Sequence, residues 1–263
     1  MFEVTVLALL QGIAEFLPIS SSGHLVIGKS LLGLEDAGIR LDIFLHVGTL
    51  AAIMAFYWRV IWRVIKNMEV SYMVKIVLSA IPAGIVGVFF KDNLEAAFSS
   101  PRMVGGALIF TGMVLSATRF IPKGTGDVSY FRAILMGIAQ AIAILPGVSR
   151  SGMTLAAARG AGVDGEKAAE FSFLMSAPPI AGAAMLEILK SMKETSDSVA
   201  QGFSPDMVAS PDPSWGLTIY GAILAAMVGY WSLKLLVQSL KGRWFWLFGP
   251  YCLLAGILTI AFC

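Results

Sequence analysis

Long apolar segments separated by short polar ones make up most of this sequence, and their lengths predict membrane-spanning helices. An apolar helix needs roughly 20 residues to cross a bilayer. Six segments approach that length with few internal charges: 41–58, 73–90, 103–120, 168–190, 215–240 and 244–262. We therefore expect an all-α polytopic membrane protein.

Two further apolar regions, 1–34 and 132–161, are interrupted by proline, serine and glycine. In the first, a helix over 1–17 is broken at Pro18, and the next apolar run, 25–34, is about half of the ~20 residues that a full span requires. We predict that each region is a re-entrant helix-loop-helix, which enters the membrane and returns on the same side. Non-helical backbone at that depth is tolerated only where it lines a cavity, so both loops should border one.

The two interrupted regions also align with each other when one is shifted by 129 residues, so that QAIAILPGVSRSG overlies QGIAEFLPISSSG. The matched pairs are Gln11 with Gln140, Ser20 with Ser149, Ser22 with Ser151 and Gly23 with Gly152. Such duplication is typical of membrane folds built from two related halves, with the functional site between them. We predict one integral membrane domain, 1–263, whose halves are inverted repeats over about 1–121 and 130–263. Each half would contain one re-entrant pair and three transmembrane helices.

The composition agrees with this architecture and excludes several classes of protein. Hydrophobic residues make up 57% of the chain and charged residues only 14%, which no soluble domain matches. A net charge of +2 is too small to suggest nucleic acid as a partner. The two cysteines, Cys252 and Cys263, both lie in the last apolar segment, so neither a disulfide framework nor a metal-ligand spacing is present.

The distribution of Lys and Arg predicts the orientation in the membrane. With the N-terminus outside, the inner loops collect eleven of the 19 basic residues and the outer loops five. The first re-entrant pair then enters from outside, the second from inside, and the long polar loop 193–214 lies outside. The N-terminus has no basic residue before Lys29 and is a poor signal peptide, so we expect it to be retained.

One basic residue, Arg150, lies between serines and glycines deep in apolar sequence. A buried arginine at that depth is costly unless it has a partner or a ligand, although its side chain can also extend to water. The loops Ser20–Gly23 and Ser149–Gly152 both open into helices, which would direct free N–H groups and two positive helix ends to one place. Together with the fork-shaped guanidinium, this arrangement indicates an oxyanion site inside a membrane.

A carboxylate and a histidine accompany the first loop. Glu15 follows Gln11 by four residues, on the same helix face, and should face a wet cavity because a charge in lipid is expensive. His24 lies one helical turn after Ser21, and we expect it to be catalytic. A structural histidine, and a Glu15 bonded to a neighbouring helix end, remain alternatives. Asp42 and His46, four apart inside a predicted span, are interpreted as a packing or cavity pair outside the site.

These residues carry a resemblance to a known family. EFLPISSSGH (15–24), with the preceding Gln11, and LPGVSRSGMT (145–154) resemble the paired signatures of the bacterial undecaprenyl-diphosphate phosphatases, the bacitracin-resistance family. DIFLHVGTLAA (42–52) and EFSFLMSAPPIAG (170–182) extend the resemblance nearly end to end. The family's (Glu/Gln)-x-x-x-Glu pattern here has Gln at its first position. An amide is neither acid nor base, so Glu15 is the only carboxylate of that pair.

The resemblance implies removal of the terminal phosphate from a C55 isoprenyl diphosphate, which recycles the lipid carrier of peptidoglycan synthesis and confers bacitracin resistance. It implies Ser21 as the nucleophile, with Ser20 and Ser22 as alternatives, and His24 and Glu15 for proton handling. The catalytic set is then Glu15, Ser21, His24 and Arg150, and the substrate-binding set is Gln11, Ser20, Ser22, Ser149, Ser151 and Thr154.

The charge of the substrate favours a divalent cation. A diphosphate carries about three negative charges near neutral pH, against one fixed cation and two partial helix-end charges of roughly half a unit each. Mg²⁺ or Ca²⁺, arriving with the diphosphate and held by Glu15, suits the oxygen ligands present.

The resemblance also implies a multi-pass protein of the bacterial inner (cytoplasmic) membrane, with its active site open to the outer (periplasmic) side. The expected partners are the isoprenyl diphosphate lipid and the membrane, with no nucleic acid. The sequence leaves open whether the chain forms a homo-oligomer. A rival function, a secondary transporter or lipid flippase that binds an anion between the repeats, is typical of such architectures. The serine, carboxylate and histidine argue against it, because transport has no use for a nucleophile and a base.

Overall fold

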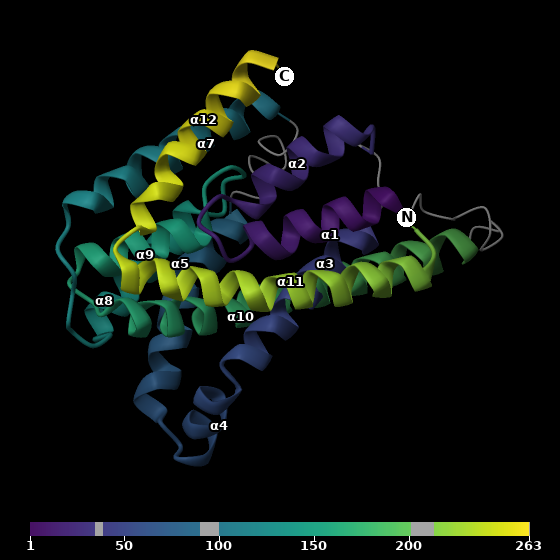
Figure 1. The fold of residues 1–263 in the computed structure, drawn as a ribbon. Helices are drawn as coiled ribbons and strands as arrows, with labels where there is room; N and C mark the ends of the chain where they lie inside the picture. Colours follow the sequence, from purple (N-terminus) through teal and green to yellow (C-terminus); the bar gives the residue numbers. More distant parts are fainter. Residues whose placement is uncertain (35–38, 90–99, 201–212, 263) are drawn as a thin grey trace.

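A computed structural model describes residues 1–34, 39–89, 100–200 and 213–262 (Figure 1). The described elements are helices, with two isolated β-bridges between residues 124–126 and 163–164. In chain order they are α1 (Phe2–Ala14), α2 (Ser21–Leu32), α3 (Ile39–Phe56), α4 (Trp58–Lys66), α5 (Val70–Phe89), α7 (Pro101–Ala117), η1 (Thr118–Phe120), α8 (Tyr130–Ile142), α9 (Arg150–Gly160), α10 (Gly165–Ala200), α11 (Trp215–Gly242), η2 (Phe245–Leu247) and α12 (Phe248–Phe262).

The long helices have the length and composition of membrane spans. Within the described ranges, five qualify singly: 70–89, 101–120, 165–186, 215–242 and 245–262. The helices α3 and α4, which meet at a bend of 67°, qualify together. These helices correspond to the six predicted segments, so the all-α, multi-pass prediction is confirmed. Residue 90, the predicted end of the second span, lies outside the described residues, as does Cys263.

Three predicted boundaries were wrong. The first helix was predicted over 1–17, but α1 ends at Ala14 and residues 15–19 form turns, because Pro18 has no N–H to donate and disfavours helical backbone at the residue before it. The polar connection was predicted to begin at residue 193, but α10 continues to Ala200, because no glycine or proline occurs between 193 and Gly202 to end the helix. The rest of that predicted loop, 201–212, is outside the described residues. The basic residues after Trp58 were assigned to a loop but form α4, which buries Val64 while Arg59, Arg63 and Lys66 remain exposed.

The two interrupted regions form short helix pairs, as predicted: α1 and α2 have 13 and 12 residues, and α8 and α9 have 13 and 11. Serine caps the second helix of each pair. The Ser20 Oγ accepts a hydrogen bond from the Gly23 N–H at 3.3 Å, and the Ser149 Oγ accepts one from the Gly152 N–H at 3.1 Å. Such caps satisfy backbone groups that would otherwise be orphaned at a helix start. Ser21 and Arg150 therefore occupy the first position of their helices rather than a loop.

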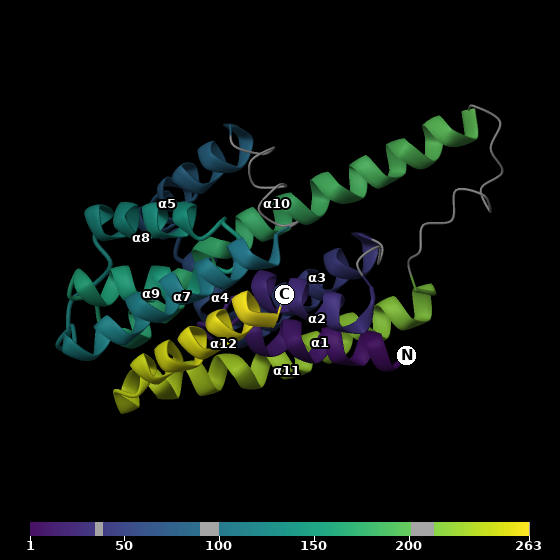
Figure 2. The ribbon, with the colours of Figure 1, turned by 90° about the horizontal axis from the view of Figure 1, so that it is seen from above.

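Helices from the two halves of the chain pack against each other (Figures 1 and 2). The helix α1 packs on α11 and α8 packs on α5, while α7 runs beside α12. Glycines permit this last contact: a Cβ at Gly105 would lie 2.9 Å from the Gly256 carbonyl oxygen, and one at Gly256 would lie 2.5 Å from the Gly105 oxygen. Small residues that let backbones approach closely are characteristic of packing in membranes.

Candidate active site

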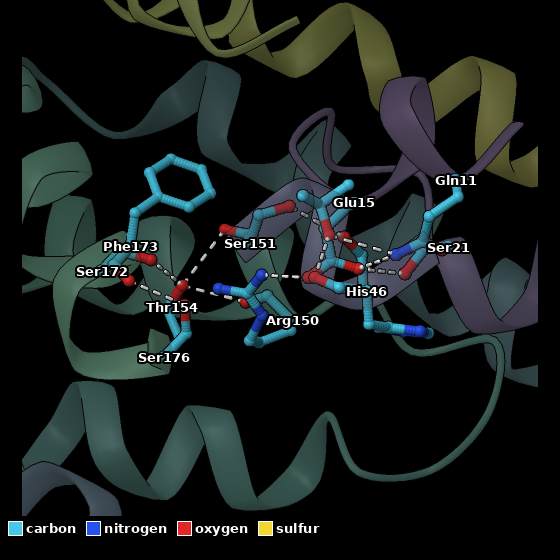
Figure 3. Close-up of polar contacts among 12 residues, drawn as sticks. Gln11, Glu15, Ser21, His46, Arg150, Ser151, Thr154, Ser172, Phe173 and Ser176 are labelled. Atoms are coloured by element: carbon cyan, nitrogen blue, oxygen red, sulfur yellow. Dashed lines mark hydrogen bonds and ion pairs between the residues drawn. The ribbon is translucent and has the colours of Figure 1, made fainter. Parts of the chain in front are cut away.

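The loops that precede α2 and α9, residues 15–20 and 143–149, lie against each other (Figure 3). The Ser20 Oγ donates to the Val148 carbonyl oxygen at 3.5 Å, and the Ser151 Oγ donates to the Leu17 carbonyl oxygen at 3.4 Å. Each contact joins one loop region to the other. The N-termini of α2 and α9 therefore meet at one place, as the sequence predicted.

Glu15 lies at the centre of this meeting point and is only 7% exposed. Its Oε1 accepts a hydrogen bond from the Arg150 Nη2 at 2.5 Å. Its Oε2 accepts one from the Ser21 Oγ at 2.7 Å and another from the Gln11 Nε2 at 3.2 Å. A buried carboxylate is stable only when paired and hydrogen-bonded, and this one has a cation and two neutral donors.

Arg150 presents its guanidinium to the cavity in a fixed orientation. One nitrogen, Nη2, donates to Glu15, and the guanidinium carbon lies over the ring of Phe173, 5.7 Å from the ring centroid. The other nitrogen, Nη1, is buried without a hydrogen-bond partner among the described residues. A planar guanidinium can bind an oxyanion through its free nitrogen while the other nitrogen donates to the carboxylate.

Of the three consecutive serines, Ser21 is the one that contacts the carboxylate. The Ser20 hydroxyl is occupied as a helix cap and lies 3.3 Å from the Ser22 hydroxyl. In the second loop, the Ser149 and Ser151 hydroxyls are also 3.3 Å apart. A hydroxyl that donates to a carboxylate is the arrangement of a nucleophile beside its base.

The structure places His24 away from this centre. Its Nδ1 is 2.9 Å from the Ser20 carbonyl oxygen, and its Nε2 is 2.7 Å from the Tyr251 hydroxyl on α12. The imidazole stacks on the Tyr251 ring at 5.7 Å. His24 is close to Ser21 along the helix, but its side chain leans on α12 instead of facing Glu15. The predicted catalytic role of His24 therefore has no support in this geometry.

A different histidine, His46 of α3, lines the same cavity as Glu15 and Arg150. Its Nδ1 is 2.8 Å from the Asp42 carbonyl oxygen. The Thr49 Oγ1 donates to the His46 carbonyl oxygen at 3.0 Å and accepts from the Gln11 Nε2 at 3.5 Å. Sequence reasoning left His46 outside the site. The sequence feature that could have identified His46 is the spacing of polar residues along one face of an otherwise apolar span.

Two predicted substrate-binding residues lie behind the site. Thr154 is fully buried, donates to the Arg150 carbonyl oxygen at 2.9 Å and lies 2.6 Å from the Ser172 Oγ of α10. Gln11 is fully buried and donates to Glu15. Neither lines the cavity, so both support residues that do.

The cavity has a volume of about 730 Å³ and two chemically different parts. Its polar end is lined by Glu15, Ser20, Ser21, Ser22, His46, Ser149, Arg150 and Ser151, and Gln140 of α8 is a further polar residue of the lining. Its apolar wall is formed mainly by α5 and α10, through Ala80, Ala83, Gly84, Gly87, Val88, Pro178, Pro179, Ile180, Gly182 and Leu186. An anionic group joined to a hydrocarbon chain has the matching distribution of polarity.

The residues at the polar end fit a cation only in company with a ligand. Within the described ranges, no group of three or more His, Cys, Asp or Glu side chains could hold a metal ion. Glu15 supplies one carboxylate, and the nearby Gln11 Oε1 is buried without a hydrogen-bond partner in the described part of the chain. Mg²⁺ is commonly held by one or two carboxylates together with phosphate oxygens, and this donor set suits that mode.

Comparisons with known proteins show the family of this chain. The profile of the family described as bacitracin resistance protein BacA matches residues 4–258. An undecaprenyl-diphosphatase of Halothermothrix orenii is 37% identical over 264 residues, with 98% of this chain and 96% of the relative covered. One of Bacteroides thetaiotaomicron is 38% identical over 268 residues, with 98% and 97% covered. These matches run through both loops and the helices around the cavity.

Proposed function

Because this chain belongs to the bacitracin resistance protein BacA family, we propose that it hydrolyses undecaprenyl diphosphate at the polar end of the cavity, with Ser21, Glu15 and Arg150 as the principal groups. The products are undecaprenyl phosphate and inorganic phosphate. The roles of the family in cell-wall synthesis and bacitracin resistance fit this reaction. The observation that carries the assignment is the chain of contacts from Ser21 through Glu15 to Arg150, at the polar end of an otherwise apolar cavity.

The reaction would proceed by attack of the Ser21 Oγ on the terminal phosphorus as its proton passes to the Glu15 Oε2, 2.7 Å away. The bond from that phosphorus to the bridging oxygen breaks, and undecaprenyl phosphate leaves. A water then attacks the phosphoserine and loses its proton to a general base. The bond from phosphorus to the Ser21 Oγ breaks, Glu15 returns its proton to that oxygen, and inorganic phosphate leaves. Arg150 and the N-terminal N–H groups of α2 and α9 would stabilise the charge on the phosphoryl oxygens.

His46 is the histidine that the geometry favours for proton handling in the second step, because it lines the cavity and His24 does not. We expect His46→Ala to reduce turnover by about 10²-fold or more, the usual contribution of a general acid or base. His24→Ala should reduce it less, and mainly through stability, since it removes the contact with Tyr251. Rates and thermal midpoints of both purified variants test this. A greater catalytic loss in His24→Ala would return the role to that residue.

The apolar wall supports a lipid substrate over a soluble one. The polar end accommodates the diphosphate, and the first isoprenyl units can lie along α5 and α10. A transporter would also bind an anion here, but the contact between Ser21 and Glu15 supports hydrolysis. Phosphate release from undecaprenyl diphosphate by the purified protein tests the proposal. Release no faster than that measured without the protein would overturn it.

A divalent cation, Mg²⁺ or Ca²⁺, is part of this proposal. When bound it would neutralise charge on the diphosphate, with Glu15 as its ligand from the protein. Chelation is then expected to abolish activity, and Mg²⁺ or Ca²⁺ to restore it. Glu15→Gln should raise the metal concentration needed for half-maximal activity, as well as slow turnover. Full activity after exhaustive chelation would mean that Arg150 and the helix ends suffice.

The halves of the chain are proposed to be inverted repeats. The order of the helices in each half pairs α1 with α8 and α5 with α11, and the packing of α1 on α11 is matched by that of α8 on α5. The paired serine caps and the reciprocal contacts between the loops further support this relation.

The orientation is proposed from the basic residues, with the N-terminus outside and the active site open to the outer side of the inner membrane. In a background with Cys252 and Cys263 replaced by alanine, Ser214→Cys should react with an impermeant thiol reagent added to intact cells. Thr125→Cys, near Lys123, should react only after the membrane is permeabilised. Both positions are exposed. The opposite labelling pattern would reverse the orientation.

A further inference from the structure

Gln140 of α8 is a buried amide without a partner. It is 4% exposed, and neither its nitrogen nor its oxygen has a hydrogen-bond partner in the part of the chain that the structure describes. Its repeat counterpart, Gln11, donates to Glu15. Buried polar side chains are almost always hydrogen-bonded, and an unpaired one destabilises the fold. The mechanism proposed above makes no use of Gln140.

The position of Gln140 suggests what its amide could bind. It lines the active-site cavity together with Ser149 and Arg150, which begin α9. The helix that carries it, α8, packs against α5, whose Ala80 and Ala83 belong to the apolar wall of the same cavity. Gln140 therefore lies on the helix that joins the polar end to the apolar wall.

A lipid diphosphate has one phosphate that leaves and one that remains on the hydrocarbon. If the terminal phosphate lies at Glu15, Ser21 and Arg150, the phosphate joined to the chain must lie between them and the apolar wall. Building on the proposed function, we propose that the Gln140 amide donates a hydrogen bond to this lipid-linked phosphate. The group is neutral, so it binds the phosphate in substrate and product alike without adding charge to the reacting centre.

The binding of the two reaction products can be measured separately, and each product reports on one of the two phosphate positions. Undecaprenyl phosphate retains the lipid-linked phosphate, whereas inorganic phosphate represents the terminal one. In Gln140→Met, which keeps the length of the side chain but cannot hydrogen-bond, we expect the KM for undecaprenyl diphosphate and the Kd for undecaprenyl phosphate to rise about 10- to 100-fold. The inhibition constant for inorganic phosphate should remain unchanged. The thermal midpoint without ligand should be unchanged or higher, because an unpaired buried amide has been removed.

The matched control is Gln238→Met, the same substitution at an exposed position of α11. It should leave all of these constants unchanged. A weakened inhibition by inorganic phosphate with normal binding of undecaprenyl phosphate would assign Gln140 to the terminal phosphate and overturn the proposal. A lower thermal midpoint with unchanged binding would make Gln140 a structural residue and also overturn it.

Direct binding of undecaprenyl phosphate, measured by equilibrium binding to the purified protein, tests Gln140 without turnover. Failure of the wild-type protein to hydrolyse the diphosphate would overturn the proposed function alone. Equal affinity of the wild-type protein and Gln140→Met for undecaprenyl phosphate would overturn the role of Gln140 alone.

Discussion

Replacement of Ser21 by alanine is expected to reduce turnover of undecaprenyl diphosphate by on the order of 10³-fold or more, with the protein still folded. The variant removes the proposed nucleophile, and removal of a group that forms a covalent intermediate is among the largest single losses in enzymes. It also removes one hydrogen bond from the Glu15 Oε2, but the carboxylate keeps Arg150 and Gln11 as partners. Burial of Glu15 should therefore remain tolerable.

The neighbouring serines provide matched comparisons in the same turn. Ser20→Ala loses a helix cap and a contact between the loops, so a lower thermal midpoint with a loss of activity near tenfold is expected. Ser22→Ala loses a hydroxyl that lines the cavity and lies 3.3 Å from the Ser20 hydroxyl, and its loss should also be near tenfold.

A covalent intermediate gives a second measurement. Substrate labelled in its terminal phosphate should leave label on wild-type protein after acid quenching, and none on Ser21→Ala. Normal turnover by Ser21→Ala, with activity abolished in Ser20→Ala or Ser22→Ala, would transfer the role to the other serine. Normal turnover by all three variants would replace the serine nucleophile with water.

Arg150→Lys is expected to reduce kcat/KM by at least about 100-fold without unfolding the protein. The ammonium of lysine can replace one nitrogen and still pair with Glu15, which keeps the buried carboxylate neutralised. It cannot also supply a second nitrogen at the place of Nη1, which is buried, has no hydrogen-bond partner among the described residues, and is proposed to bind a phosphate oxygen. The contact of the guanidinium carbon with the Phe173 ring is lost as well.

Arg119→Lys is the matched control, since that guanidinium also lies over an aromatic ring, at 4.7 Å from the centroid of Trp246, and is exposed outside the cavity. It should keep wild-type kinetics. Steady-state rates and thermal midpoints of the two variants decide the outcome. Near-normal kcat/KM for Arg150→Lys would remove Arg150 from the phosphate site and leave it as the structural partner of Glu15.

Local patterns in the sequence were sufficient to predict the helices and the two loops. Runs near 20 apolar residues require helices, because lipid offers no partner to an unpaired backbone. Ser20 and Ser149 marked the starts of helices because a short hydroxyl side chain can cap free N–H groups. The matching motifs, 129 residues apart, led to the prediction that the two loops lie together, and the structure confirms that they meet. Glu15 and Arg150 were identified because a charge in apolar sequence needs a partner.

The tertiary structure decided which other polar side chains face the cavity. His24 is nearer than His46 to Ser21 in sequence, yet α12 provides a hydroxyl that holds the His24 ring, while α3 brings His46 to the cavity. Thr154 belongs to the motif but is turned toward Ser172 of α10. Gln140 and Gln11 occupy matching positions in the two repeats. Only Gln11 has a carboxylate one helical turn later in the sequence. Sequence spacing determines the face of a helix on which a residue lies, whereas the packing of other helices determines what that face contacts.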